Sequence, residues 1–194
     1  LAHHRLADFE KLQGQPEPAS CRLEIGLHPA ILYRPGDTGG KLRGMASGVL
    51  RLKRGRDRVR VHPWIFKGDV ADVGDVEPGG EVTVVDSTAR FVGRGFFNPR
   101  PALCCRILTR ADEPLDTAFF GRRIGEALAR RAPATASEPV ALGRLVWSEA
   151  DGLPALVVDR YGPVLALQCL TLGMARARGD VVGALRARLG DLPV

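Results

Sequence analysis

The densest group of residues suited to ligand chemistry is a run of cations between residues 51 and 60. Arginine and lysine neutralise phosphates and release their counterions, so such a run favours a nucleic-acid-binding surface. A charge run is also typical of a merely solvated face, and the two readings have about equal weight on this feature alone. The cations are Arg51, Lys53, Arg54, Arg56, Arg58 and Arg60, beside a single acid, Asp57.

An aromatic and apolar segment, His62-Pro-Trp-Ile-Phe66, follows the cations directly and ends at Lys67. An aromatic anchor beside alternating cations suits a surface that meets phosphates. Trp64 and Phe66 are more typical of a core than of a base-stacking platform, and we interpret His62 and Trp64 as architectural residues. The segment therefore supports nucleic-acid binding through its position beside the cations.

Composition sets the outer bounds. Lys and Arg number 28 against 22 Asp and Glu, a net charge of +6, although a GC-rich genome also enriches arginine. Four cysteines (Cys21, Cys104, Cys105, Cys169) show no CxxC pair and no ligand spacing to a histidine, so we expect reduced core thiols and no metal. No stretch approaches the ~20 apolar residues of a membrane span, and the N-terminus has no signal-peptide pattern. A cytoplasmic protein with no membrane partner is expected.

Other candidate sites are weak. Gly93-Arg-Gly95 begins like a dinucleotide fingerprint but lacks the third glycine and lies in a predicted strand. Glu149, Asp151 and Asp159 are interpreted as structural carboxylates, because Asp in turns usually bonds the backbone. No strand is followed by a Gly-rich turn and a helix N-terminus, as S-adenosylmethionine, ATP or NAD would need. We therefore predict no catalytic, cofactor-binding or metal-binding residue in this chain.

The elements that position the cations are short strands. Residues 81–86, 90–97 and 103–109 read as strands separated by Gly and Pro turns, which predicts a small barrel. Gly93 and Gly95 within the middle strand indicate a bulge or corner, where the backbone bends or a partner approaches closely.

The second half reads as a different unit. It is predicted to contain a helix opened by Asp112-Glu113-Pro114 and ended by Pro133, a strand over 142–149, a hairpin of 154–160 and 164–171, and a helix from near Gly173. The fold class is therefore α+β: a small β pseudo-barrel followed by an incomplete strand, hairpin and helix unit, with no Rossmann-like domain.

Residues 1–44 differ from the rest, since they are rich in Pro and Gly and show no helical or strand period. The chain begins with Leu1, while Met45 stands just before the organised region. Our hypothesis is that Met45 is the natural start and that residues 1–44 are a disordered extension or upstream read-through. The expected divisions are 1–44, 45–112 for the barrel and 113–194 for the truncated α+β unit.

Four segments combine residues in a specific way. They are Leu52–Arg58 (LKRGRDR), His62–Phe66 (HPWIF) with Gly68, Gly93-Arg-Gly95 with Asn98-Pro99, and Glu149–Pro154 (EADGLP) leading into Val157–Gly162 (VVDRYG). Together, over roughly residues 49 to 190, they resemble the N-terminal part of the bacterial class I, S-adenosylmethionine-dependent 23S ribosomal RNA cytosine-5 methyltransferases. In that family the HPW region is a PUA domain, a small RNA-binding pseudo-barrel. A central α+β domain carries ExDGLP, and a Rossmann-like methyltransferase domain follows.

The resemblance implies an enzyme whose cysteine thiolate attacks C6 of a cytosine. C5 of that cytosine then takes a methyl group from S-adenosylmethionine, and abstraction of the C5 proton releases the thiolate. Ser148 and Ala155 stand where the family often has glycine, and Cys104, Cys105 and Cys169 do not match the catalytic cysteine. This chain is thus expected to be inactive alone and to position large-subunit ribosomal RNA. The expected RNA-binding residues are Arg51, Lys53, Arg54, Arg56, Arg58, Arg60, Lys67, Arg94, Asn98 and Arg100.

Two other readings stay open. The chain could act as a free-standing PUA-type RNA-binding adaptor without catalysis, which predicts the same basic surface. It could also belong to another RNA-modifying enzyme, such as a pseudouridine synthase or a transglycosylase, in which PUA modules also occur. The EADGLP and VVDRYG segments argue against the latter, because they lie outside the barrel.

Overall fold

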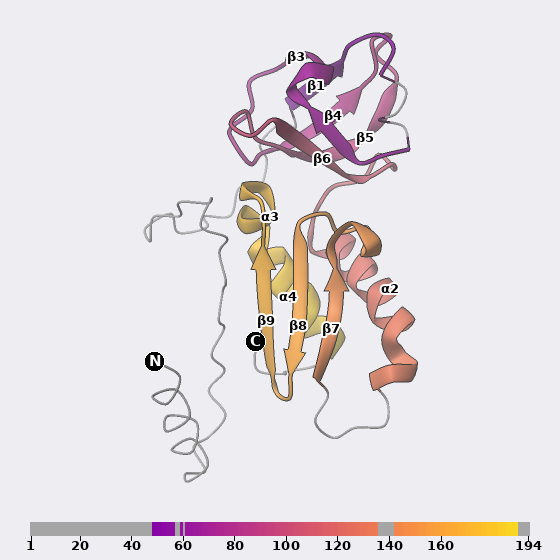
Figure 1. Ribbon diagram of the computed structural model, residues 1–194, viewed down its shortest axis with the longest axis vertical. Coiled ribbons are helices and arrows are strands. Elements are labelled where there is room, and N and C mark those ends of the chain that lie inside the picture. Colours follow the sequence, from indigo (N-terminus) through magenta and orange to yellow (C-terminus); the bar gives the residue numbers. More distant parts are fainter. Residues whose placement is uncertain (1–47, 57–58, 60, 136–141, 190–194) are drawn as a thin grey trace, which may run out of the picture.

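A curved, six-stranded mixed sheet forms the first part of the chain (Figure 1). The computed structural model describes residues 48–56, 59, 61–135 and 142–189, so the predictions made for residues 1–44 and for a start at Met45 lie outside it. The strands are β1 (Gly48–Leu52), β2 (Trp64–Phe66), β3 (Val70–Val73), β4 (Glu81–Val85), β5 (Phe91–Phe97) and β6 (Leu103–Thr109), with the short 3-10 turn η3 (Lys67–Asp69) between β2 and β3. We call this sheet the half-barrel.

The strand order of the half-barrel is β2-β6-β5-β4-β1-β3. Every pair is antiparallel except β1 with β4, which run parallel in a register that places Arg51 opposite Val85. Alternate side chains turn inward, as the period of a strand requires, and form a core that includes Leu50, Ile65, Val82 and Val84, each fully buried. The three predicted strands β4, β5 and β6 are confirmed, within a residue at their ends.

The glycines of β5 are needed where β6 crosses it. A Cβ on Gly95 would lie 2.1 Å from the carbonyl oxygen of Arg106, and one on Gly93 would lie 2.6 Å from that of Thr109. The β5–β6 register shifts between Arg94 and Gly95. The predicted bulge and close approach are therefore confirmed, with β6 itself as the approaching segment.

The second unit is a three-stranded antiparallel sheet of order β7-β8-β9, with α4 against one face and α2 beside β7 (Figure 1). Its elements are α2 (Thr117–Thr135), β7 (Leu142–Trp147), the 3-10 turn η4 (Ser148–Asp151), β8 (Leu156–Tyr161), β9 (Val164–Cys169), α3 (Leu172–Arg176) and α4 (Arg178–Leu189). Helices and sheet share one core, which includes Phe119, Phe120, Val158, Leu167 and Leu185. The predicted hairpin is confirmed.

Two helix predictions are corrected. The first helix begins at Thr117, because Asp116 rather than Asp112 caps it: Asp116 Oδ1 accepts a hydrogen bond from Phe119 N at 3.0 Å. It continues two residues beyond Pro133, to Thr135, so Pro133 does not end it. The final helix is two helices, α3 and α4, separated at Ala177. The mixed half-barrel followed by a small α+β unit nevertheless agrees with the predicted class.

The structure gives a reason for the two positions where the resemblance leads one to expect glycine. Ser148 has φ 44° and Ala155 has φ 68°, both in the left-handed region that favours glycine. The turn compensates in part, because Ser148 Oγ accepts a hydrogen bond from Ala155 N at 2.8 Å. Both residues are thus tolerated in a turn whose backbone shape is the one glycine adopts most readily.

Candidate nucleic-acid interface

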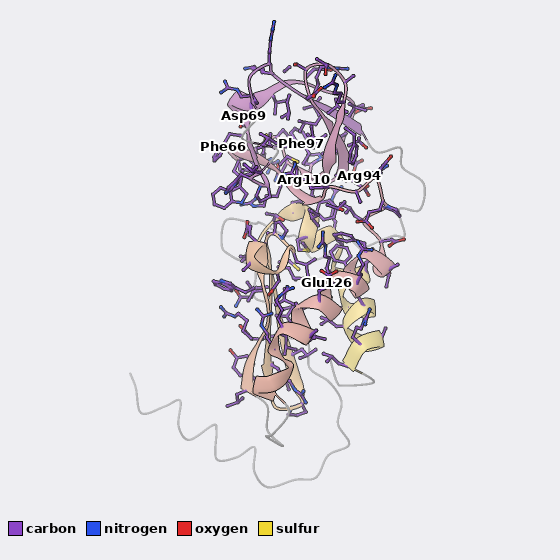
Figure 2. The ribbon with its side chains drawn as sticks, turned by 90° about the vertical axis from the view of Figure 1, so that its right-hand side faces the viewer. Phe66, Asp69, Arg94, Phe97, Arg110 and Glu126 are labelled. Atoms are coloured by element: carbon purple, nitrogen blue, oxygen red, sulfur yellow. The ribbon has the colours of Figure 1, made fainter. Side chains whose placement is uncertain are left out.

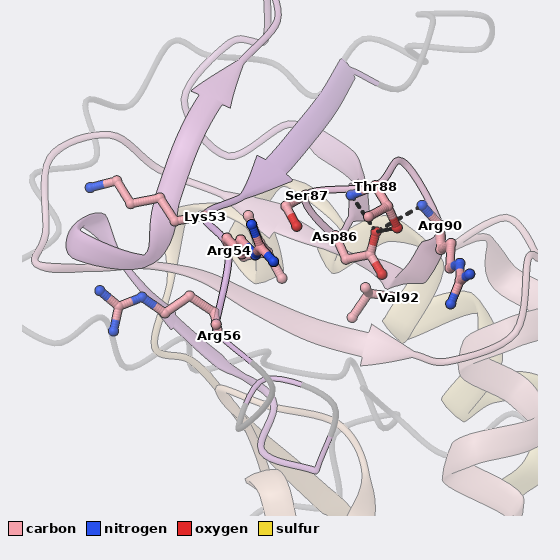
Figure 3. A pocket seen from close by; sticks show the side chains of 10 residues that line it. Lys53, Arg54, Arg56, Asp86, Ser87, Thr88, Arg90 and Val92 are labelled. Carbon is pink, nitrogen blue, oxygen red and sulfur yellow. Dashed lines mark hydrogen bonds between the residues drawn. The ribbon is translucent and has the colours of Figure 1, made fainter.

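Parallel pairing of β1 and β4 brings two distant loops together. Both strands end at the same edge of the sheet, so residues 53–56, after β1, lie beside the turn of residues 86–90, after β4. Between the loops is an open hollow of about 330 Å³ (Figure 3). Its lining consists of Leu52, Lys53, Arg54, Gly55, Arg56, Asp86, Ser87, Thr88, Arg90 and Val92.

Four exposed cations surround this hollow: Lys53, Arg54, Arg56 and Arg90. We call these four residues the basic edge. Figure 3 shows Lys53 and Arg56 projecting on one side and Arg90 on the other. Within the part of the chain that the structure describes, Lys53, Arg54 and Arg90 make no side-chain ion pair. Their charge is therefore available to an external anion such as a phosphate.

An acid inside the basic edge shapes the turn. Asp86 Oδ1 accepts hydrogen bonds from Thr88 N at 2.8 Å, Thr88 Oγ1 at 2.8 Å and Arg90 N at 3.0 Å (Figure 3). Such bonding of an aspartate to the backbone that follows it is the usual way Asp fixes a tight turn. Asp86 thus holds Arg90 in place beside the loop of residues 53–56.

Among the residues that the structure describes, Arg56 is the one member of the basic edge that pairs with an acid. Its Nε lies 3.5 Å from Oδ1 of Asp69, which is buried and also accepts a hydrogen bond from Phe66 N at 2.9 Å. Arg56 remains partly exposed. It can therefore both compensate the charge of Asp69 and contribute positive potential to the surface.

A second group of predicted residues meets at the loop between β5 and β6. Lys67 Nζ donates to the backbone oxygen of Arg100 at 3.0 Å, and Asn98 Oδ1 accepts from Arg100 N at 3.0 Å. Asn98 thus shapes the loop, while Arg100 is exposed. The structure brings these three predicted residues together, at a loop separate from the basic edge.

Arg94 lies elsewhere. Figure 2 places it, with Arg110, at the end of the half-barrel nearer the second unit, while Asp69 lies toward the opposite end. Arg94 forms ion pairs with Glu81, at 3.1 Å, and with Asp112. The hydrogen bond to Asp112 raises the pKa of the Arg94 guanidinium. A residue that bridges two acids has little charge left for phosphate, and its RNA-binding role stays a prediction.

The remaining predicted residues divide into two cases. Arg51 is half-buried on the outer side of β1, between strands β3 and β4. Arg58 and Arg60 lie outside the described residues. The RNA-binding roles of all three stay predictions.

The sequence reasoning missed two arginines. Arg90 joins the basic edge only because β1 and β4 are parallel neighbours, a pairing that no local pattern indicates. Arg110 donates to the backbone oxygens of Val59, at 2.6 Å, and of Val92 and His62, both at 3.2 Å. Arg110 thereby links Val59 and His62, which follow the cations of the basic edge in sequence, to Val92 of β5. The sequence shows an arginine at both positions, but it does not show which residues lie beside Arg90 and Arg110 in the fold.

The aromatic segment is architectural in its contacts. Ile65 is fully buried, Trp64 is about one-third exposed, and the rings of His62 and Trp64 meet edge to face with centroids 4.9 Å apart. Trp64 Nε1 donates a hydrogen bond to Glu149 of the second unit at 2.8 Å. One edge of the indole is therefore occupied by protein.

The carboxylates of the second unit hold arginines. Asp151 is buried and accepts hydrogen bonds from Arg130, Arg131 and the backbone of Trp147. Burial alone would raise the pKa of Asp151, but the bonds from Arg131 and Arg130 lower it below its ordinary value. Asp159 pairs bidentately with Arg144 across β7 and β8. The interpretation of Asp151 and Asp159 as structural is supported by these contacts.

The cysteines are not poised for nucleophilic attack. Cys104, Cys105 and Cys169 are free and buried, as predicted, while Cys21 lies outside the described residues. Burial raises the pKa of all three thiols, that of Cys169 to about 11. In the described ranges no cluster of three or more potential metal ligands occurs, and no helix is long and apolar enough to cross a membrane.

Comparison with known proteins agrees with this geometry. The PUA-like domain family matches residues 49–110, which is the half-barrel. The ribosomal RNA large subunit methyltransferase I of Klebsiella pneumoniae is 34% identical over 149 residues, and that of Shewanella frigidimarina is 36% identical over 150 residues. Over this length the chain is similar in sequence to ribosomal RNA large subunit methyltransferase I proteins. The resemblance found in the sequence is thereby confirmed.

The match to this methyltransferase family covers 75% of the chain but only 37% of the Klebsiella protein and 38% of the Shewanella protein. The chain thus spans well under half the length of these relatives. Two solved structures share the fold: a proposed methyltransferase in complex with S-adenosylhomocysteine, with a TM-score of 0.65 and 14% identity, and a proposed S-adenosylmethionine-dependent methyltransferase of Streptococcus mutans, with a TM-score of 0.64 and 13% identity. Each aligns with 74% of this chain and 38% of its own.

Proposed function

We propose that the half-barrel binds large-subunit ribosomal RNA and positions it for S-adenosylmethionine-dependent methylation of a cytosine at C5. The observation that carries this proposal is the basic edge, a cluster of exposed cations on a PUA-like fold. The relatives named above are ribosomal RNA methyltransferases, which supports RNA as the ligand. The choice of cytosine C5 rests on the sequence resemblance.

The basic edge suits recognition of RNA by its backbone. An A-form helix offers little base sequence to side chains, so proteins hold it through phosphate and 2′-hydroxyl contacts. Lys53, Arg54 and Arg90 are cations that project from two loops, while the hydroxyl of Thr88 lies between them. Such a surface would bind phosphates on adjacent nucleotides with little preference for sequence.

The chemical step is assigned to groups outside the described residues. S-adenosylmethionine would supply the methyl group. Among the described elements, no strand leads through a glycine-rich turn into a helix N-terminus of the kind that receives such a cofactor, so no residue here is assigned to it. The thiols of Cys104, Cys105 and Cys169 are buried with raised pKa values and are assigned no nucleophilic role. The part assigned to this chain is binding and orientation.

The RNA-binding proposal is tested with Arg54→Glu combined with Arg56→Glu. We expect a fluorescence-labelled ribosomal RNA hairpin to bind this variant roughly 30-fold more weakly than the parent, about 2 kcal/mol, because two phosphate contacts become repulsive. The measurement is fluorescence anisotropy at fixed salt. Arg186→Glu combined with Arg188→Glu, on α4, makes the same change in net charge and should bind nearly as well as the parent.

Equal affinity of the Arg54/Arg56 variant and the parent would refute the assignment of the basic edge. The methylation part has its own test. The full-length protein is incubated with ribosomal RNA and S-adenosylmethionine carrying a labelled methyl group, and the modified nucleoside is identified by mass. Methyl label on cytosine C5 is expected, and label on another base or atom would overturn the C5 assignment while leaving RNA binding intact.

A further inference from the structure

The two segments that identify this chain most specifically touch each other. HPWIF lies in the half-barrel and EADGLP in the second unit, yet Trp64 Nε1 donates to Glu149 Oε1 at 2.8 Å across 85 residues of sequence. Arg106 of β6 approaches the same oxygen, with its Nε at 3.8 Å. Glu149 therefore receives a neutral donor and a cation, both from the half-barrel.

The turn that carries Glu149 is rigidly held. Ser148 Oγ donates to Glu149 Oε2 at 2.5 Å and accepts from Ala155 N at 2.8 Å. Two residues further on, Asp151 is buried and bound by Arg130 and Arg131. The carboxylate of Glu149 is thus presented from a fixed backbone and not from a flexible loop.

The charge of Arg106 explains why a carboxylate lies at this contact. Its Nε is buried and has no hydrogen-bond partner among the described residues, and burial lowers the pKa of its guanidinium. The carboxylate of Glu149 supplies the compensating charge. Burial would raise the pKa of Glu149, but the hydrogen bonds from Ser148 and Trp64 outweigh it and keep the carboxylate ionised. Removing Glu149 would leave a half-buried cation without its acid.

A second region of contact lies at α3, directly beneath the half-barrel (Figure 1). Gly173 packs so closely on Phe96 of β5 that an added Cβ would lie 2.2 Å from Phe96 Cβ. Arg176 Nη1 pairs with Glu77 Oε2 at 3.1 Å. Contacts at η4 and at α3 together prevent the half-barrel from pivoting about a single point.

We infer that Trp64, Glu149 and Arg106 form a joint that fixes the angle between the half-barrel and the second unit. The Glu of EADGLP is then a positioning residue, through which RNA held on the basic edge is presented at one orientation to the rest of the enzyme. This role rests on the proposed function, but the fixed angle itself exists without RNA. It also explains why the two motifs occur in the same chain: each supplies one half of the joint.

The joint is tested by measuring the distance between the two units in the whole chain. Spin labels are placed on cysteines introduced at Asp72 of β3 and Gln168 of β9, both exposed, in a background with Cys21→Ser; the other cysteines are buried. Pulsed electron–electron double resonance without RNA should give one narrow distribution of the distance between the two labels. Glu149→Ala should broaden it, and so should Trp64→Phe, which removes the indole N–H donor while keeping an aromatic ring.

Glu149→Gln keeps an acceptor for the indole but loses the charge that compensates Arg106, so it should broaden the distance less than Glu149→Ala does. A distribution in both Glu149→Ala and Trp64→Phe as narrow as in the parent would overturn the inference, and Trp64→Phe keeps the test decisive if the alanine variant fails to fold. The RNA-binding proposal is tested by a separate measurement, so that either proposal can fail without the other. Arg54→Gln with Arg90→Gln should leave the distance unchanged, while Trp64→Phe should leave the affinity of the whole chain for an RNA hairpin unchanged.

Discussion

Arginines serve opposite purposes in two regions of this protein, the buried acids of the second unit and the basic edge. At the buried acids they form ion pairs: Arg130 and Arg131 hold Asp151, and Arg144 holds Asp159. At the basic edge, Arg54 and Arg90 project into solvent and make no ion pair with any residue that the structure describes. Residue type alone does not distinguish these arginines. Their partners do, and a functional surface is recognised by charge that the fold itself does not use.

The largest effect is expected where a buried acid is removed. Asp151→Asn should lower the free energy of unfolding by about 2 to 3 kcal/mol, because two arginines lose their shared carboxylate and a buried backbone donor loses its best acceptor. Urea unfolding measures the change. Asp75→Asn, which alters an exposed acid, should change it by less than about 0.5 kcal/mol. Equal effects would show that the pairing in the second unit is not structural.

Low pH should also lower the free energy of unfolding, because it protonates the carboxylates that hold these arginines. The pKa of Asp151 and that of Glu149 are lowered in the folded protein, so their stabilisation is complete above the ordinary carboxyl pKa of about 4 and is lost as the pH falls through the lowered values. The unfolding free energy should therefore decline below about pH 4. Asp151→Asn should make that decline shallower, as followed by urea unfolding at several pH values. An identical pH profile in the variant would contradict the assignment.

The smallest effect is expected at the more exposed pair. Arg144 also lies over the ring of Trp147, 4.2 Å from its centroid, and the side chain of Asp159 is 12% exposed, against 3% for that of Asp151. Water screens such a pair, so Asp159→Asn should cost at most about 1 kcal/mol of unfolding free energy. Thermal unfolding of Asp159→Asn and of Asp151→Asn under the same conditions shows which variant loses more unfolding free energy. A larger loss for Asp159→Asn than for Asp151→Asn would break the argument that burial decides the strength of these pairs.

Local patterns were enough to predict β4, β5, β6 and the hairpin of β8 and β9, but not the strands β1, β2 and β3. β6 was predicted at Leu103–Thr109 and lies there, because its Gly and Pro turns and its apolar run are all local signals. The glycines of β5 also indicated their bulge. The helix break at Ala177 was missed, since α3 and α4 together read as one apolar period.

The site was less predictable, because its members come from separate parts of the chain. Lys53, Arg54 and Arg56 were visible as a run of charge, but Arg90 joins them only through the parallel pairing of β1 with β4. The two acids that neutralise Arg94 are 13 and 18 residues away from it in sequence. A sequence pattern shows where charge is; only the fold shows whether that charge is already paired.

The salt dependence of RNA binding tests this account most directly. For a protein that binds phosphates, the logarithm of the binding constant falls linearly with the logarithm of the salt concentration, by roughly one unit of slope per contacted phosphate. Arg54→Gln with Arg90→Gln should reduce the slope by about 2, whereas Arg186→Gln with Arg188→Gln on α4, of equal charge change, should leave it at the parent value. Equal slopes for the two variants would contradict the claim that the basic edge is where this protein meets RNA.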